Sequence, residues 1–371
     1  MTSPTYAVIN LDALQHNLKI VRHYAPNAKV MPVIKANAYG HGMVRTASAL
    51  QSADAFAVAR VDEGVNLRKA GISNKITVLE GFSCNNELEA ILNYRLDPVV
   101  HSFTQLSMLE ARMELNTCSI WLKLDTGMNR LGFKSDELVI AYQRLKHCPF
   151  IKGPINLMTH LSHADATKDK TTLKQISLFN ETVTSLFANQ KNDSNPCAYS
   201  IANSAGILAW PSALTDWVRP GIMLYGISPF PNKTGEQYQL KPAMTLYSRL
   251  IAVKSLLKGD KVGYSGTWTC SKPTRLGIVA IGYGDGYPRH AKEGTPVLVN
   301  NQRVPLVGRV SMDMLTVDLK SQPDAKLGDC VILWGNGLAI EEIAHYADTI
   351  PYALACGITQ RVRIVEQGLT L

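Results

Sequence analysis

The residues with the clearest chemical potential lie in the segment 33–42, Val-Ile-Lys-Ala-Asn-Ala-Tyr-Gly-His-Gly, where a lysine ends an apolar stretch. Burial disfavours the ammonium form and lowers the pKa of a lysine, which would prepare Lys35 for Schiff-base formation and proton transfer. Gly40 and Gly42 allow the backbone to turn and to approach a ligand closely. The lysine alone would equally fit a strand end that reaches solvent.

Eight short apolar runs alternate with helical patterns over the first two-thirds of the chain, and most end in a polar residue. The runs cover residues 30–34, 55–59, 76–79, 97–100, 120–124, 155–159, 199–202 and 218–222. Helical spacing recurs at 42–50, 61–69, 104–115, 137–145 and 171–187. Apolar strands separated by helices are typical of parallel strands covered on the outside, and eight such units predict a (β/α)8 TIM-type barrel. Barrel active sites form at the carboxyl ends of the strands, where these polar residues would gather.

The alternation of apolar runs with helical patterns ends after residue 229. Residues 230–238 contain Pro, Asn, Lys and Gly and are typical of a linker. Short β-branched runs then follow at 244–255, 276–281, 297–299, 304–310, 315–319 and 331–333, with helical patterns at 339–347 and 351–355. We therefore predict an α/β barrel domain over residues 1–235 and a mainly-β domain over residues 236–371.

Composition excludes several classes of protein. The 371 residues carry a net charge of +8, but the basic residues are scattered, which argues against nucleic-acid binding. The seven cysteines form no Cys-x-x-Cys pair, so neither a disulfide framework nor a metal site is expected. There is no signal-peptide pattern and no apolar stretch of the roughly 20 residues that span a bilayer. These features predict a cytoplasmic protein without a membrane partner.

The segment around Lys35 resembles the pyridoxal-phosphate attachment motif of the alanine racemase family. Further segments resemble that family in the same order along the chain: IWLKLDTGMNRLGF (120–133), THLSHAD (159–165), ANSAGIL (202–208), VRPGIMLYG (218–226), VGYSGTW (262–268), GYGDGYPR (282–289) and GRVSMDM (308–314). The resemblance covers nearly the whole chain, and its ordered motifs make it specific.

The resemblance implies an isomerase that interconverts L- and D-alanine with pyridoxal 5'-phosphate and provides D-alanine for peptidoglycan. Lys35 would bind the cofactor covalently and act as one base, and Tyr264 would be the second base at the α-carbon. The cofactor would act as the electron sink. An unperturbed tyrosine has a pKa near 10, so Tyr264 would need a nearby cation, for which His160 and Arg130 are the candidates by family analogy.

The remaining roles also rest on the resemblance. Arg219 would contact the pyridine nitrogen; because a guanidinium only donates hydrogen bonds, it would leave that nitrogen unprotonated and suppress transamination and decarboxylation. Arg130 would bind the substrate carboxylate, oriented by Lys123, which is carbamylated in many members. The other cofactor-binding residues would be Tyr39, His160, Ser204, Gly221, Ile222 and Tyr352.

Met312 and Asp313 would lie on the substrate side. By the family pattern they and Tyr264 come from the partner chain of a homodimer, so that each active site is shared between two subunits. A monomer would then lack the second base.

Three alternatives stay open at this point. A basic amino-acid decarboxylase also combines a barrel with a β domain, but generally places a carboxylate where Arg219 stands. A non-catalytic pyridoxal-phosphate-binding barrel would need neither Tyr264 nor a second domain. A racemase for serine or a larger side chain differs by only about 1–3 kcal/mol per methylene in a pocket.

Overall fold

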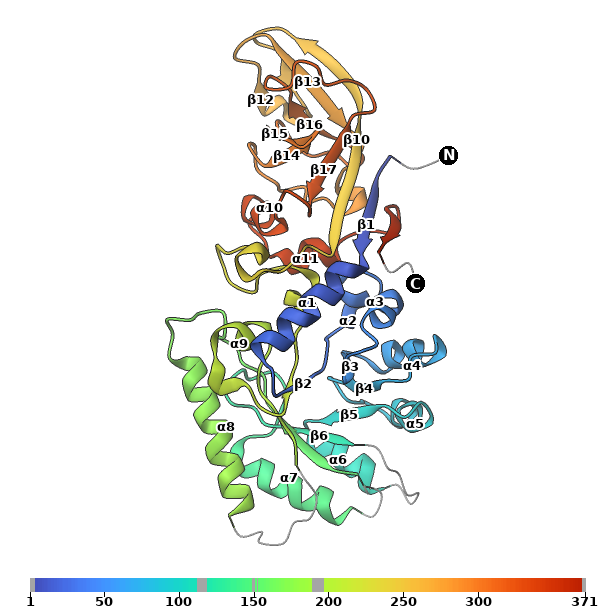
Figure 1. Ribbon diagram of the computed structural model, residues 1–371, viewed down its shortest axis with the longest axis vertical. Coiled ribbons are helices and arrows are strands. Elements are labelled where there is room, and N and C mark those ends of the chain that lie inside the picture. The colour runs from blue at the N-terminus through green and yellow to red at the C-terminus, as the bar shows by residue number, and fades with distance from the viewer. Residues whose placement is uncertain (1–3, 112–118, 149–150, 152, 189–196, 369–371) are drawn as a thin grey trace. The chain divides into compact units, whose positions relative to one another are not determined.

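The computed structural model describes residues 4–111, 119–148, 151, 153–188 and 197–368 (Figure 1). The chain forms two compact units. The barrel unit contains Leu18–Ala38 and Gly42–Met223, and the β unit contains Met1–Asn17, Tyr39–His41 and Leu224–Leu371.

Eight parallel strands form the barrel unit. In chain order they are β2 (Lys29–Val30), β3 (Ala55–Val58), β4 (Lys75–Val78), β5 (Asp97–Val100), β6 (Ile120–Lys123), β7 (Ile155–Met158), β8 (Tyr199–Ser200) and β9 (Trp217–Val218). The sheet runs β2-β9-β8-β7-β6-β5-β4-β3, and a parallel bridge from Val33 to Ala57 joins its two ends. The predicted barrel is therefore confirmed.

Helices cover the outside of this sheet, as Figure 1 shows for α7 and α8. They are α3 (Met43–Ala49), α4 (Val61–Lys69), α5 (Asn85–Asn93), α6 (Phe103–Glu110), α7 (Ser135–His147), α8 (Thr171–Phe187) and α9 (Ser204–Ala209). All four residues of β3 and of β6 are buried, as expected for strands enclosed on both faces. In α8 the buried residues include Thr172, Gln175, Ile176 and Phe179, the spacing of one helix face.

Two predicted strands are shorter than their apolar runs. The run 30–34 holds only the end of β2 and the Val33 bridge before a helical turn, α2 (Lys35–Tyr39). In the run 218–222, β9 ends at Val218, although the Arg219 N–H still donates to the Ala202 carbonyl and the Pro220 carbonyl accepts from Val33. The 3-10 turn η2 (Ile222–Tyr225) follows. The predicted helix 104–115 corresponds to α6, and its residues after 111 lie outside the described part of the chain.

The second unit is mainly β, which confirms the other half of the predicted fold class. Its main sheet runs β15-β14-β17-β10-β1-β18, with β13 paired to β10 and β16 paired to β13. These strands are β1 (Tyr6–Asn10), β10 (Met244–Leu256), β13 (Thr274–Val279), β14 (Pro296–Val299), β15 (Gln302–Pro305), β16 (Leu315–Asp318), β17 (Cys330–Trp334) and β18 (Arg363–Gln367).

Shorter elements complete this unit and connect the chain. They are α1 (Leu11–Tyr24), η1 (Pro211–Ala213), η3 (Gly235–Tyr238), β11 (Lys261–Val262), η4 (Tyr264–Gly266), β12 (Trp268–Thr269), η5 (Tyr283–Asp285), α10 (Ile340–Tyr346) and α11 (Pro351–Cys356). The patterns 339–347 and 351–355 correspond to α10 and α11.

The first strand of the chain belongs to this second unit. β1 is antiparallel to β10 and parallel to β18, which places Ala7 opposite both Leu246 and Ile364. Residues 4–17 were included in the predicted barrel domain 1–235, whereas their contacts group them with residues after 224. The boundary between 235 and 236 stays a prediction.

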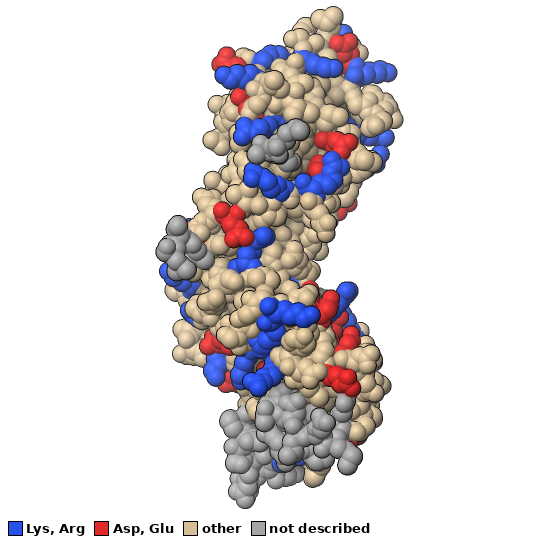
Figure 2. Space-filling model, turned by 90° about the vertical axis from the view of Figure 1, so that its right-hand side faces the viewer, with Lys and Arg blue, Asp and Glu red and all other residues tan. Residues whose placement is uncertain are grey.

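Charges of both signs are interspersed on the face shown in Figure 2, where Lys and Arg side chains lie among Asp and Glu side chains. Among the helices that the structure describes, none has the length and apolar character needed to cross a membrane.

Candidate active site

Lys35 is followed by a left-handed turn. Ala36, Asn37, Ala38 and Tyr39 all have φ between 51° and 54°. For residues with a Cβ, this conformation costs roughly 1–2 kcal/mol each, so surrounding contacts must hold it. The Asn37 side chain supplies one, because its Oδ1 accepts the N–H of Met43 at 2.9 Å, while its carbonyl accepts the N–H of Gly42 at 2.9 Å.

Glu63 ties this turn to the end of β3. Its Oε1 accepts the N–H of Ala36 at 2.7 Å, and its Oε2 accepts the N–H groups of Ala59 at 2.8 Å and Arg60 at 3.2 Å. The backbone directly after Lys35 is thus fixed by a carboxylate from the first turn of α4. Sequence reasoning did not single out Glu63, and only its place three residues after the strand-end Arg60 could have indicated it.

Five cationic or titratable groups of the barrel unit, which end or follow β2, β6, β7 and β9, act on one another. Burial, followed by the charges of Arg219, Arg130 and Lys35, lowers the pKa of Lys123 to about 8. The same influences, together with Lys123, lower the pKa of His160 well below its ordinary value. The structure therefore brings together Lys35, Lys123, Arg130, His160 and Arg219, and their roles in a site stay a prediction.

Arg219 is the most deeply placed of these cations, with 4% of its surface exposed. It donates to the Ser200 hydroxyl and to the carbonyls of Thr159 and Ile201, the last at 3.3 Å. Burial lowers the pKa of Arg219 to about 10, so it stays protonated at neutral pH. These three bonds use three of the five guanidinium N–H groups, which leaves donors for a ligand acceptor.

Ser204 connects the chain after β8 to the chain after β9. Its Oγ accepts the N–H groups of Gly221 at 2.9 Å and Met223 at 3.4 Å. Two accepted bonds occupy both lone pairs of the hydroxyl, which directs its O–H donor to another acceptor. Ile222 opens η2, and the first N–H groups of such a turn have no acceptor within it. The Ser204 hydroxyl and the Ile222 N–H are thus donors suited to an anion, whereas the Gly221 N–H is already used by Ser204.

Tyr39 and Tyr352 lie together in the β unit, with ring centroids 6.0 Å apart. Tyr39 also packs on Tyr225 at 4.9 Å, and its carbonyl accepts from Nδ1 of the buried His41 at 3.0 Å. Burial, followed by the proximity of Tyr352 and Cys356, raises the pKa of Tyr39. The Tyr39 phenol is therefore a neutral hydrogen-bonding group at physiological pH.

Gly40, between Tyr39 and His41, has no room for a side chain. A Cβ at this position would lie 2.1 Å from the Ala355 carbonyl oxygen, and its φ of 83° also favours glycine. This close approach packs the end of the left-handed turn against α11.

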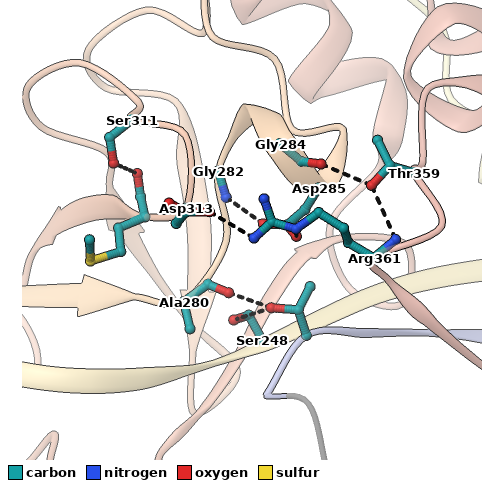
Figure 3. Close-up of polar contacts among 11 residues, drawn as sticks. Ser248, Ala280, Gly282, Gly284, Asp285, Ser311, Asp313, Thr359 and Arg361 are labelled. Atoms are coloured by element: carbon teal, nitrogen blue, oxygen red, sulfur yellow. Dashed lines mark hydrogen bonds and ion pairs between the residues drawn. The ribbon is translucent and has the colours of Figure 1, made fainter.

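Tyr264, Met312 and Asp313 are exposed residues of the β unit. Tyr264 begins η4 and is 68% exposed, and Met312 is 52% exposed. Figure 3 shows the polar contacts around Asp313, whose Oδ1 accepts from Nη2 of Arg361 at 2.7 Å. Arg361 also lies 3.3 Å from Asp285 through its Nε. All three side chains are therefore accessible in the single chain.

Backbone bonds join the two turns of this region. The carbonyl of Met312 accepts the N–H of Gly284 at 2.8 Å, and the carbonyl of Ser311 accepts the N–H of Tyr283 at 3.1 Å. Within the first turn, Asp285 Oδ2 accepts the N–H of Gly282 at 3.0 Å. Asp285 and Arg361 were not among the predicted site residues, although Asp285 stands inside the motif GYGDGYPR.

Comparison with known proteins agrees with this arrangement over almost the full chain. The family model "Alanine racemase, N-terminal domain" matches residues 9–229, and "Alanine racemase, C-terminal domain" matches residues 243–366. The chain belongs to the alanine racemase family. A curated alanine racemase from Coxiella burnetii (strain RSA 331 / Henzerling II) is 49% identical over 97% of this chain and 98% of its own. One from Shewanella sediminis is 47% identical over 96% and 98%.

Solved alanine racemases share the fold. The biosynthetic alanine racemase from Pseudomonas aeruginosa has a TM-score of 0.92 at 40% identity and covers 99% of this chain and 100% of its own. The alanine racemase from Acinetobacter baumannii has a TM-score of 0.90 at 34% identity, covering 99% and 100%. Membership of the alanine racemase family makes the protein an isomerase that acts on an amino acid.

Proposed function

We propose that the protein interconverts L- and D-alanine with pyridoxal 5'-phosphate, attached at Lys35. The observation that carries this proposal is a group of interacting cations in the barrel unit of a chain of the alanine racemase family, namely Lys35, Lys123, Arg130 and Arg219. Such a group is suited to a cofactor and a substrate that both carry negative charge.

The residues present fit this cofactor. Arg219 has spare donors for a ring nitrogen. The Ser204 hydroxyl and the Ile222 N–H are proposed to donate to a phosphate, with Gly221 holding Ser204 in place through its own N–H. Tyr39 and Tyr352 are the proposed phenol donors, and His160 is proposed to contact the cofactor in its neutral form, since its pKa is well below the ordinary value. The bound cofactor would supply the electron withdrawal that acidifies the substrate α-proton.

Lys35 and Tyr264 are proposed to move the proton. The charge of Lys35 acts on both Lys123 and His160, so its Nζ belongs to the same group of interacting side chains. Tyr264 of the partner chain would hold the proton on the opposite face of the α-carbon. A racemase needs both groups, because each enantiomer presents its α-proton to a different face.

Arg219 directs the reaction toward racemisation. It is protonated and buried, so a ring nitrogen that accepts from it stays unprotonated and withdraws electrons less strongly. This argues against the decarboxylase alternative, which generally places a carboxylate at that point. Arg130 is proposed to bind the substrate carboxylate, and Met312 and Asp313 of the partner chain to line the substrate side.

The biological setting follows from the same proposal. We infer a cytoplasmic homodimer with shared active sites that provides D-alanine for peptidoglycan. Alanine is the proposed substrate, and serine is the nearest alternative that the same experiment can compare.

The test is α-proton exchange. Purified protein with pyridoxal phosphate is incubated with L-alanine in deuterated water, and D-alanine and α-deuteration are followed. D-alanine carrying α-deuterium, abolished in Lys35→Ala and retained in Lys69→Ala, is the expected result; Lys69 is an exposed lysine at the end of α4. No exchange, despite borohydride fixation of the cofactor to Lys35, would retain the cofactor and reject the reaction.

A further inference from the structure

We propose that Asp125 is a positioning residue whose carboxylate shapes the loop of residues 125–133 and thereby fixes Arg130 for the substrate carboxylate. The inference rests on the proposed role of Arg130 and extends it to a residue that does not itself touch substrate. Asp125 lies two residues after Lys123, the last residue of β6, and its side chain is 6% exposed.

Both ends of the loop are attached to the barrel. The N–H of Asp125 donates to the Phe133 carbonyl at 2.8 Å, and the N–H of Phe133 donates to the Lys123 carbonyl at 2.9 Å. Leu124 forms a parallel bridge with Phe133 and donates to the Met158 carbonyl of β7 at 2.8 Å. The loop therefore begins and ends beside Lys123. These bonds fix its two ends but leave the path of the chain between them undetermined.

The Asp125 carboxylate sets that path. Its Oδ1 accepts the N–H groups of Gly127 and Asn129, both at 3.0 Å. Its Oδ2 lies 3.2 Å from Nζ of Lys134, and the same Nζ donates to Asn129 Oδ1 at 2.8 Å. Two residues of the loop and one residue after it thus converge on a single buried carboxylate.

The loop needs this support because part of its backbone adopts a left-handed conformation, which is unfavourable for a residue with a side chain such as Asn129. Gly127 and Gly132 have φ of 127° and 128°, and Asn129, directly before Arg130, has φ of 55°. A Cβ at Gly132 would lie 2.7 Å from the backbone nitrogen of Asp125. Left-handed backbone persists where surrounding contacts determine it, and the bond from Asn129 N–H to Asp125 fixes the direction in which the chain enters Arg130.

Electrostatics agree with an ionised Asp125 and an Arg130 directed at the site. Burial raises the pKa of Asp125, but the N–H groups of Gly127 and Asn129 and the Lys134 ammonium outweigh it and hold the pKa below its ordinary value. Although Arg130 is an exposed residue, its charge lowers the pKa of both Lys123 and His160. The loop carries its guanidinium back toward the groups at the strand ends.

The test compares Asp125→Ala, Asp125→Asn and Lys134→Met with Asp136→Asn as control, an exposed acid in the first turn of α7. On the holoenzyme we would measure kcat and KM for L-alanine, the Kd of propionate by calorimetry, and the midpoint of thermal unfolding. Propionate carries the carboxylate of alanine without its amine.

Asp125→Ala should raise KM and the propionate Kd together by at least about tenfold, the loss expected for charge-assisted bonds. Asparagine keeps an oxygen acceptor for both N–H groups, so Asp125→Asn should raise these constants by only about two- to fivefold. Lys134→Met removes the ammonium that holds Asp125 Oδ2 but keeps both N–H bonds to Oδ1, so it should raise them by a similar factor. Asp136→Asn should leave them unchanged. In an Arg130→Ala background, Asp125→Ala should add nothing further, since the two residues act through one contact.

A lowered unfolding midpoint with unchanged KM and propionate Kd would overturn the proposal, and so would full additivity with Arg130→Ala. Should Asp125→Ala not fold, unchanged constants in both Asp125→Asn and Lys134→Met would overturn it equally. If the wild-type holoenzyme does not racemise alanine, the proposed function fails, and the propionate Kd still decides whether Asp125 shapes a carboxylate site.

Discussion

Glu63 accepts the backbone N–H of Ala36 at 2.7 Å, which fixes the peptide that directly follows Lys35. The lysine thus owes its backbone position to a carboxylate 28 positions later in the sequence. That carboxylate also accepts the N–H of Ala59, at the end of β3. A change at Glu63 should therefore alter the position of Lys35 through the backbone bond to Ala36.

Glu63→Ala should weaken cofactor binding about tenfold and reduce the free energy of unfolding by roughly 1–3 kcal/mol, because three N–H groups lose their acceptor and a left-handed turn loses its support. Glu63→Gln keeps one acceptor oxygen and should lie between alanine and wild type. The cofactor Kd from absorbance titration and urea unfolding measure the two effects. The matched control is Asp62→Ala, the neighbouring acid in the same helical turn, and equal effects of the two alanine variants would contradict this account.

Lys123 should react with carbon dioxide at mildly alkaline pH. Its pKa of about 8 leaves half of its amine neutral at pH 8, whereas a lysine with the ordinary pKa of about 10.4 would be almost fully charged. A carbamate would replace a positive charge beside Arg130 with a negative one and relieve the repulsion. We expect a carbamate signal in carbon-13 NMR with labelled bicarbonate, lost in Lys123→Ala and kept in Lys134→Ala. Its absence from wild-type protein between about pH 7 and 9 would mean that Lys123 stays unmodified.

Tyr264→Phe should separate the two proton transfers. Removal of the phenolic oxygen should lower racemisation at least about a hundredfold, in line with the loss of a general acid–base group. Lys35 can still exchange the proton on its own face, so one enantiomer of alanine should acquire α-deuterium in deuterated water without inverting. Mass spectrometry of the recovered enantiomers measures this. Tyr346→Phe, a change of the same kind elsewhere in the β unit, should leave both rates unaltered, and loss of exchange from both enantiomers in Tyr264→Phe would contradict the assignment of two bases.

Asp97 should make the stability of the protein depend on pH. Burial raises its pKa to about 6, against the opposing N–H of Ser119 and the charges of Lys75 and Arg68. Because the folded pKa exceeds the unfolded one, this group's contribution is fully present below about pH 4 and is lost as the pH rises through about 6. Asp97→Asn should therefore gain up to about 2–3 kcal/mol relative to wild type between pH 4 and pH 7.5.

Urea unfolding at both pH values and at equal protein concentration checks this prediction. The asparagine introduced by Asp97→Asn would keep an acceptor for the Ser119 N–H, which Asp97 Oδ1 binds at 3.1 Å, so the comparison isolates the charge. A difference in unfolding free energy that does not change with pH would exclude Asp97 as the titrating group.

The sequence by itself determined the fold class and the family. Apolar runs that alternate with helical patterns identify parallel strands, because a strand that is buried on both faces needs apolar residues at successive positions. Such a pattern can be recognised from adjacent residues alone. The ordered motifs from residue 33 to residue 314 likewise indicated the residues that the barrel brings together, among them Lys35, Lys123 and Arg219. Strand ends can be found from polarity, and the barrel topology then requires that they meet.

Only the tertiary structure decided the contacts between distant segments. β1 pairs with β10 and β18, more than 230 residues away, and a five-residue apolar pattern cannot specify such partners. The left-handed turn at Ala36–Tyr39 and the loop shaped by Asp125 use residues with no special preference for that backbone, apart from Asn and Gly. The pKa of Lys123 depends on burial and on three cations from other positions in the chain. Local sequence encodes local conformation, whereas strain, pairing and electrostatic coupling arise when packing brings separate segments within a few ångströms.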